Sequence, residues 1–352
     1  MLTNSFSLAV CGQGAVTPNG LGVSSLLQSD PWPLQKIVSL TNPDKTFPVY
    51  SVNLKEEHWK PWQQEPRLRR ASPLSFFMME AAHQALSHEN DISRKKIGLV
   101  AALNTGCIYY SRRFFQGILE QGQRFASPAL FPETVFNSPL SHVAAVLGVK
   151  GACYSIVGDH TAWATAIQIA KTWLQSYDKE KMEKVLVLGA EELDPIACEA
   201  YHLAGWFKKG WVPAEGAGAL LLKRASVSDK ICITQIHEGY PYRNRQQAKQ
   251  QAQALLEKCW PHHKILTSAQ RNWFHSIETA SCKSSQILTP SHAYCGEGFT
   301  ASAAWHSLRA ITHLTPKTPS LFQPIWGLNQ QISALEFALS CDRLENASSQ
   351  SR

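Results

Sequence analysis

Cysteine is the residue best suited to nucleophilic chemistry, and this chain of 352 residues contains nine. They stand singly, without a Cys-x-x-Cys pair, as Cys11, Cys107, Cys153, Cys198, Cys232, Cys259, Cys282, Cys295 and Cys341. This spacing argues against a zinc cluster and against a disulfide framework. It favours a location in the reducing cytoplasm. The question is then whether any of the nine stands where a fold would use a thiolate.

Short apolar segments alternate with amphipathic ones along the chain. The strands and helices that they form must position any catalytic residue. Helices are expected at 73–87, 107–122, 139–148, 161–176, 244–258 and 300–312. Strands are expected at 96–103, 151–158, 185–193, 217–225, 231–239 and 273–280, with closing β segments at 324–339. Apolar strands that alternate with helices predict an α/β architecture with covered sheets.

The segment 7–22 predicts a strand followed by a glycine-rich turn. Its Gly12-x-Gly14 pair is not a dinucleotide-binding fingerprint, because the third glycine is missing and Pro18 interrupts the position of the helix.

Composition narrows the class of protein. The chain is 44% hydrophobic and 17% charged, which excludes a disordered chain. We find neither an 18-residue apolar run nor a basic N-terminal region, so a membrane span and a signal peptide are not expected. The formal charge of +7 is mild and dispersed. It predicts solvated surface or an acidic protein partner rather than nucleic acid.

Five segments, in order, resemble the β-ketoacyl synthases of the thiolase fold: GQGAVTPNGLG, RLRRAS, FPETVFNSPLSHVAAVLGVKGACYSI, VLVLGAEEL and EGAGALLLKRA. HAYCGEGFTASAAWHSLRAI is similar to the family's Gly-His-Thr segment and the helix after it. The resemblance implies a layered αβαβα core of two pseudo-repeated halves. These are 1–226 and a shortened 227–341, followed by a disordered tail at 342–352.

The resemblance also identifies three positions of family chemistry. The family uses a cysteine thiolate at a helix N-terminus to accept an acyl chain, and two histidines to support decarboxylation and stabilise the enolate. Here His160 stands at the nucleophile position, and Ala280 and Glu297 stand at the histidine positions. No catalytic residue is therefore expected. Neither a metal nor a resident cofactor is implied, because the family's acyl chain arrives on the phosphopantetheine of a carrier protein.

A branch of this family, the chain-length factors of type II polyketide synthases, has the fold without the chemistry, and this sequence resembles that branch most. The resemblance implies a non-catalytic subunit that forms a heterodimer with a catalytic ketosynthase, is served by an acyl carrier protein, and shapes the polyketide or polyene elongation tunnel. Carried over position by position, the tunnel residues are Ile108, Ser111 and Phe115, which share one helical face. Trp163 stands where the family prefers glycine and should restrict the acyl pocket.

Other interpretations remain open. His160 could act as nucleophile or base in an acyltransferase or hydrolase, since a helix N-terminus favours a neutral imidazole. The chain could instead be a purely structural partner that sets no chain length. The simplest interpretation of His160 is a residue that fills a vacated pocket. On its own the chain is expected to be inactive, and dimerisation is expected around GACYSI, the strand that would otherwise expose an edge.

Overall fold

The structure is a computed structural model that describes residues 6–28, 32–178, 180–259, 264–267, 273–281, 287–288, 296–328 and 331–339. The tail predicted at 342–352 lies outside these residues, and so does Cys295. Among the described helices, none is long and apolar enough to cross a membrane.

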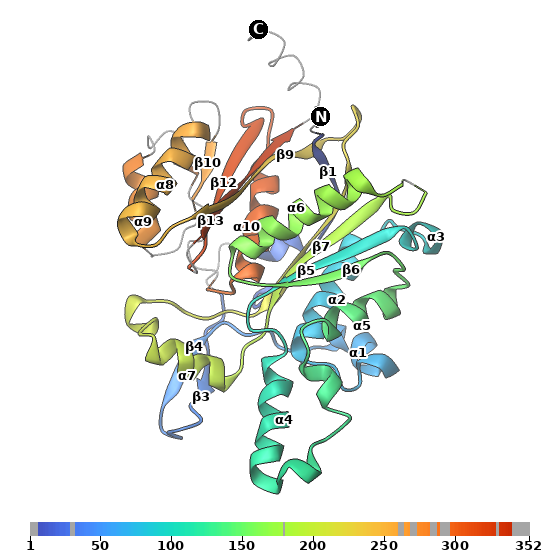
Figure 1. The fold of residues 1–352 in the computed structure, drawn as a ribbon, viewed down its shortest axis with the longest axis vertical. Coiled ribbons are helices and arrows are strands. Elements are labelled where there is room, and N and C mark those ends of the chain that lie inside the picture. The colour runs from blue at the N-terminus through green and yellow to red at the C-terminus, as the bar shows by residue number, and fades with distance from the viewer. Residues whose placement is uncertain are drawn as a thin grey trace.

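One large mixed sheet organises the chain, with β1 near the middle of its strand order, β11-β10-β12-β13-β9-β1-β8-β7-β5-β6 (Figure 1). The strands of the first half are β1 (Leu8–Thr17), β5 (Ile97–Leu103), β6 (Cys153–Val157), β7 (Lys184–Glu191) and β8 (Gly216–Arg224). Those of the second half are β9 (Ile231–Pro241), β10 (Lys264–Leu266), β11 (Ile287–Leu288), β12 (Ser320–Trp326) and β13 (Gln331–Leu339). The short β2 (Gly20–Leu21) pairs with β1. The two halves meet where β1 pairs with β9, at Leu8 opposite Ile233 and Ala9 opposite Cys232.

Helices cover both halves of the sheet and separate them. The outer face of the first half is covered by α2 (Pro73–Ala85) and α5 (Ser138–Leu147). Between the halves lie α6 (Thr161–Ser176) and α10 (Thr300–His313), which contact strands of both. The second half is covered by α8 (Arg245–Cys259) and α9 (Trp273–Ser281). These layers confirm the predicted αβαβα architecture (Figure 1).

Smaller elements extend from one end of these layers. The helix α4 (Ile108–Gln121) projects beyond them, and α7 (Pro195–Leu203) lies beside the hairpin of β3 (Gln35–Val38) and β4 (Thr46–Val49) (Figure 1). The remaining short helices are α1 (Lys60–Gln64) and α3 (Asp91–Arg94).

The strand predicted at 273–280 was wrong, because this segment is the helix α9. Phe274 and Ile277 are both buried in the same cluster, three residues apart. A strand would have placed them on opposite faces, whereas a helix places them on one. Trp326 of β12 stacks on Phe274 at 5.0 Å and donates its indole N–H to Glu278 at 2.6 Å, which holds this face of α9 against the sheet.

Close packing explains the two glycines of the first strand. A Cβ at Gly12 would lie 2.0 Å from the carbonyl oxygen of Ala85, and one at Gly14 would lie 2.0 Å from that of Ala81. Both carbonyls belong to the backbone of α2. The glycine pair therefore lets α2 lie directly on β1 and serves packing rather than ligand binding.

The substitution Gly14→Ala should destabilise the protein by about 1–3 kcal/mol, because the new methyl group would push α2 away from the sheet. Gly117→Ala is the matched control, since Gly117 lies within α4 and a Cβ there meets nothing within 4 Å. That change should be neutral or stabilise by up to about 1 kcal/mol. Urea unfolding measures both. Equal stability for Gly14→Ala and the wild type would show that α2 does not need this contact.

Candidate functional site

His160 and Glu297 come from opposite halves of the chain and meet between the layers. His160 follows β6 and stands immediately before α6. The carboxylate of Asp159 fixes this helix start by accepting from the backbone N–H of Thr161 at 3.1 Å and from its hydroxyl at 2.9 Å. The backbone of Glu297 is tied to Val212 and Ala214 by hydrogen bonds of 2.7 and 3.0 Å. Asp159 therefore serves the helix, and His160 pairs with Glu297 instead.

The contact between the two side chains is direct. Nε2 of His160 lies 2.6 Å from Oε1 of Glu297, and each residue is only 5% exposed. The same oxygen accepts the backbone N–H of Phe299 at 2.8 Å. Phe299 has φ of 45°, and it is the one non-glycine residue with positive φ in the described part of the chain. Glu297 therefore stabilises both the imidazole and the strained turn that begins α10.

The protonation of His160 follows from this partner. Burial lowers the pKa of His160, but the charge and hydrogen bond of Glu297, assisted by Asp159, outweigh it and raise the pKa above the usual 6.5. The raised pKa favours the protonated ring as a donor to Glu297. A protonated imidazole is neither a nucleophile nor a general base, so the neutral form that either role requires is disfavoured.

Aromatic side chains close the space in front of this pair. Trp206 stacks on Tyr201 with ring centroids 4.8 Å apart and an interplanar angle of 6°. Phe299 lies 5.7 Å from Trp206 and 5.6 Å from the ring of His160. The hollow that remains among these rings, Trp211 and Glu297 has no space for a molecule the size of water. An acyl chain cannot reach His160 here unless these rings move.

The free thiols of the described residues are Cys11, Cys107, Cys153 and Cys198, and none stands at the start of α6. Burial raises the pKa of every one, to about 11 for Cys11 and about 12 for Cys198. These groups therefore stay protonated at neutral pH and are poor nucleophiles. Cys232 is disulfide-bonded, which the isolated spacing of the cysteines did not predict.

Two further residues assigned from the sequence take no part in the ion pair of His160 and Glu297. Ala280 is exposed near the end of α9, in the outer layer, so the strand on which its assignment rested is absent. Trp163 is fully buried between α6 and α10, where its indole N–H donates to the hydroxyl of Ser307 at 2.8 Å. It fills the central layer as a core residue.

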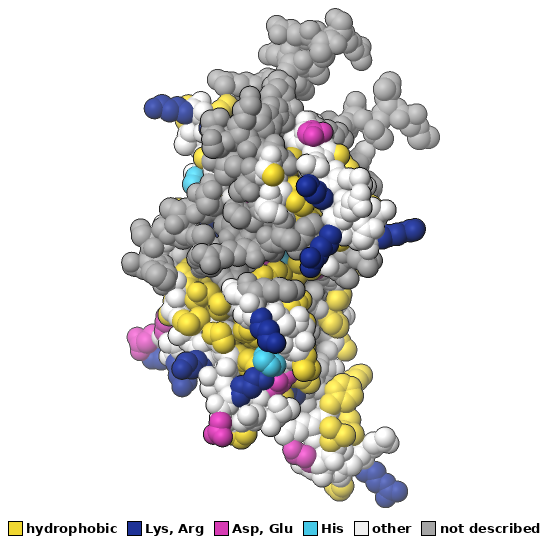
Figure 2. Space-filling model, turned by 90° about the vertical axis from the view of Figure 1, so that its left-hand side faces the viewer, with side chains coloured by type: hydrophobic (Ala, Val, Ile, Leu, Met, Phe, Trp, Pro, Cys, Tyr) yellow, Lys and Arg dark blue, Asp and Glu magenta, His cyan; other side chains and the backbone are white. Residues whose placement is uncertain are grey.

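The three residues assigned to the tunnel lie along α4, in a row that leads away from the His160–Glu297 pair. Ile108 packs against the cluster that contains Tyr201 and Phe299. The hydroxyl of Ser111 donates to the carbonyl of Cys107 at 2.8 Å. Phe115 is 61% exposed. Figure 2 shows hydrophobic side chains on this projecting end of the molecule. The row thus leads from the aromatic cluster to an uncovered apolar surface.

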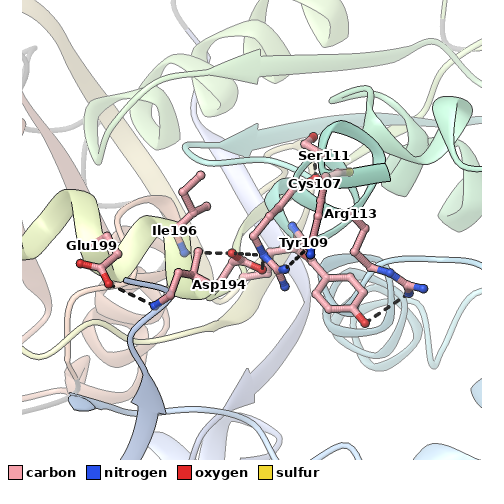
Figure 3. A network of polar contacts seen from close by, with 11 residues as sticks. Cys107, Tyr109, Ser111, Arg113, Asp194, Ile196 and Glu199 are labelled. Carbon is pink, nitrogen blue, oxygen red and sulfur yellow. Dashed lines mark hydrogen bonds and ion pairs between the residues drawn. The ribbon is translucent and has the colours of Figure 1, made fainter. Parts of the chain in front are cut away.

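A row of acidic residues at the end of β7 was missed by the sequence analysis. The carboxylate of Glu191 accepts from the backbone of Thr105, and Asp194 pairs with Arg112 (Figure 3). One side-chain oxygen of Glu192 accepts the backbone N–H of Tyr109 at the start of α4, and the other accepts that of Leu74 at the start of α2. Both distances are 2.9 Å. Burial raises the pKa of Glu192 to about 8. The sequence signal for this row is Glu-Glu-Leu-Asp-Pro, which follows an apolar strand. Within it, Asp194-Pro195 is typical of a helix start.

An open strand edge lies on the same half of the molecule. β6 ends the strand order of the sheet, with β5 as its partner. Its side chains Tyr154 and Val157 are 54% and 55% exposed. Exposed apolar edges of this kind are prone to pair with another chain.

The free energy of unfolding should fall as the pH rises from about 6 to about 9. The pKa of His160 is raised by Glu297, and burial raises those of Glu192 and Glu215, to about 8 and about 7. Each group holds its proton more tightly when folded, so its contribution is complete below the unfolded pKa and is lost as the pH rises through the folded one. Chemical denaturation across this range tests the trend.

His160→Gln keeps a donor for Glu297 but does not titrate, so its stability should depend less on pH. His88→Gln changes an exposed histidine and should keep the wild-type slope. Identical slopes for His160→Gln and the wild type would contradict the assignment of a raised pKa to His160.

Comparison with known proteins shows which family model matches part of the chain and which solved structures share its fold. Residues 55–228 match the family model for the β-ketoacyl synthase N-terminal domain. No curated protein sequence matches the chain significantly.

Solved structures match almost the whole chain. A structure titled the ishigamide ketosynthase/chain length factor aligns with a TM-score of 0.71 and 13% identity, covering 95% of this chain and 99% of that one. A ketosynthase in complex with its chain length factor from Xenorhabdus doucetiae gives a TM-score of 0.72 and 11% identity, covering 97% and 100%. A β-ketoacyl synthase from Burkholderia phymatum gives a TM-score of 0.71 and 14% identity, covering 95% and 99%. Residues 55–228 therefore belong to the β-ketoacyl synthase family, and the chain around them has the thiolase-like fold of ketosynthase structures.

Proposed function

We propose that this chain is a non-catalytic, chain-length-factor-like subunit of a type II polyketide synthase. In this proposal it forms a heterodimer with a catalytic ketosynthase and contributes one wall of the elongation tunnel. Neighbouring structures include such pairs and a type II acyl carrier protein in complex with its ketosynthase. The acyl chain would therefore be delivered on the phosphopantetheine of a carrier protein, with the chemistry performed by the partner subunit.

The observation that carries the proposal is the buried contact between His160 and Glu297. The sequence resemblance assigns the two to the positions of a nucleophile and of a catalytic histidine, and here Nε2 of His160 and Oε1 of Glu297 bind each other, while the buried Nδ1 and Oε2 have no hydrogen-bond partner among the described residues. Burying two opposite charges is tolerable only when they are paired and hydrogen-bonded. Such a pair is suited to holding the fold together where a ketosynthase would do chemistry.

A hydrolase or acyltransferase that works through His160 is less well supported. Such an enzyme needs a neutral imidazole and access for an acyl group. Glu297 favours the protonated ring, and the aromatic cluster around Trp206 covers it. The cytoplasmic location expected from the isolated cysteines stays a prediction.

The surface offered to a partner combines the edge of β6 with the apolar side of α4. Phe115 and Leu119 of α4 are 61% and 86% exposed. An apolar ring left in water gains about 1.5–3 kcal/mol when it becomes fully buried. We propose that the ketosynthase covers this surface, so that the tunnel residues of α4 become buried in the complex.

Phe115→Ala should lengthen the product made by the complex, because removal of the ring enlarges the tunnel wall that α4 provides. The measurement is mass spectrometry of the products of the purified pair. Val227→Ala is the control, since Val227 is 74% exposed in a loop after β8. An intact complex that makes products of unchanged length would exclude Phe115 as a gate.

His160→Gln should leave the turnover of the complex within about twofold of the wild type, because chemistry is assigned to the partner and the Glu297 contact is retained. Turnover of carrier-bound acyl substrates is measured for the complex and for each chain alone. Activity of this chain alone that disappears in His160→Gln would instead establish the hydrolase or acyltransferase.

A further inference from the structure

We infer that Asp194, through its ion pair with Arg112, sets the rotation of α4 and thereby selects which side chains of this helix face the tunnel. The inference rests on the proposed function and adds a positioning residue to it. It comes from the way in which α4 is attached to the layers.

Two attachments at its first turns hold α4 to the end of β7. Glu192 accepts the backbone N–H of Tyr109 at 2.9 Å, which is a cap at the amino end of the helix. Asp194 contacts Nε of Arg112 through both carboxylate oxygens, at 2.7 and 2.8 Å (Figure 3). Further along, the contacts of α4 are mainly with the turns that follow it in the chain.

The two attachments restrict different movements. A cap to a backbone N–H fixes where the helix axis begins but leaves the helix free to turn about that axis. The ion pair of Arg112 in the second turn opposes this rotation more strongly than the long contact of the Ser111 hydroxyl with the carbonyl of Thr134, at 3.4 Å. Successive residues lie about 100° apart around a helix, so Arg112 points about 100° away from Ser111. Holding Arg112 against Asp194 therefore fixes the direction of the row Ile108, Ser111 and Phe115.

Asp194 is itself held rigidly. Its side chain is fully buried, and it accepts the backbone N–H of Ile196 at 3.0 Å as the N-cap of α7. Glu199, one turn further along α7, accepts the backbone N–H of Leu40 at 3.1 Å, which ties α7 to the hairpin of β3 and β4. Arg112 therefore binds a fixed point, and its side chain as a whole retains 21% exposure.

The test compares Asp194→Asn and Arg112→Gln with Arg113→Gln. Asparagine caps helices as well as aspartate does, so α7 should remain intact in Asp194→Asn. Arg113 is the exposed neighbour of Arg112, and its guanidinium lies 3.3 Å from the hydroxyl of Tyr109. Arg112→Lys keeps the positive charge and should partly restore the wild-type behaviour.

Hydrogen exchange is measured for the chain alone, and product length is measured for its complex with a ketosynthase. In Asp194→Asn and Arg112→Gln, amide exchange within α4 should accelerate at least about tenfold, as expected for loss of a hydrogen bond between charged groups. Both variants should also shift the product-length distribution, whereas Arg113→Gln changes neither. A shift in one variant is sufficient if the other does not fold.

The contrary outcomes are distinct. Unchanged product length in an intact complex of Asp194→Asn or Arg112→Gln would overturn the inference, even if exchange increases. Unchanged exchange in α4 would overturn it without any partner. A wild-type chain that pairs with no ketosynthase would contradict the proposed function, while the exchange experiment still decides whether Asp194 holds α4.

Discussion

The ion pair of His160 and Glu297 is the constraint around which the middle of this molecule is built. It joins the start of α6 to the start of α10, the two helices that separate the halves of the sheet. Neither charge could remain there alone, because an unpaired buried charge costs several kcal/mol. The strained turn at Phe299 persists because the same carboxylate accepts its N–H. One contact therefore joins the two helices of the middle layer, supports the turn at Phe299 and raises the pKa of the imidazole.

The end of β7 has a comparable role for the projecting part of the chain. Three acidic residues there hold α4 by hydrogen bonds. Glu191 binds the segment that leads into α4, and Glu192 and Asp194 bind its first two turns. The carboxyl oxygens replace the partners that a helix N-terminus lacks. Glu192 also serves α2, so the outer layer and the projecting helix share one buried group. Placement of α4 is consequently a property of the sheet and of its acidic end.

Local patterns in the sequence predicted most of the fold. Segments that begin with a short apolar run, such as 185–193 and 217–225, favour buried strands, and the helices carry their apolar residues at helical spacing. The segment 273–280 was predicted as a strand because its aromatic and β-branched residues favour one. It forms a helix, which buries Phe274 and Ile277 on one face. His160 and Glu297 were both singled out from the sequence. Their pairing could not be, because it spans 137 residues. The aromatic cover and the Arg112–Asp194 pair likewise depend on contacts that the sequence alone does not show.

The place of β1 in the sheet has a consequence for synthesis on the ribosome. β1 is made long before its main partners, β8 and β9, which follow it by more than 200 residues. Contacts between segments so far apart in sequence slow folding, because a long loop must close before they form. Until β8 has been made, the hydrophobic faces of β1 and α2 lack the sheet that buries them. During synthesis this N-terminal segment therefore exposes apolar surface of the kind that promotes aggregation until β8 has been made.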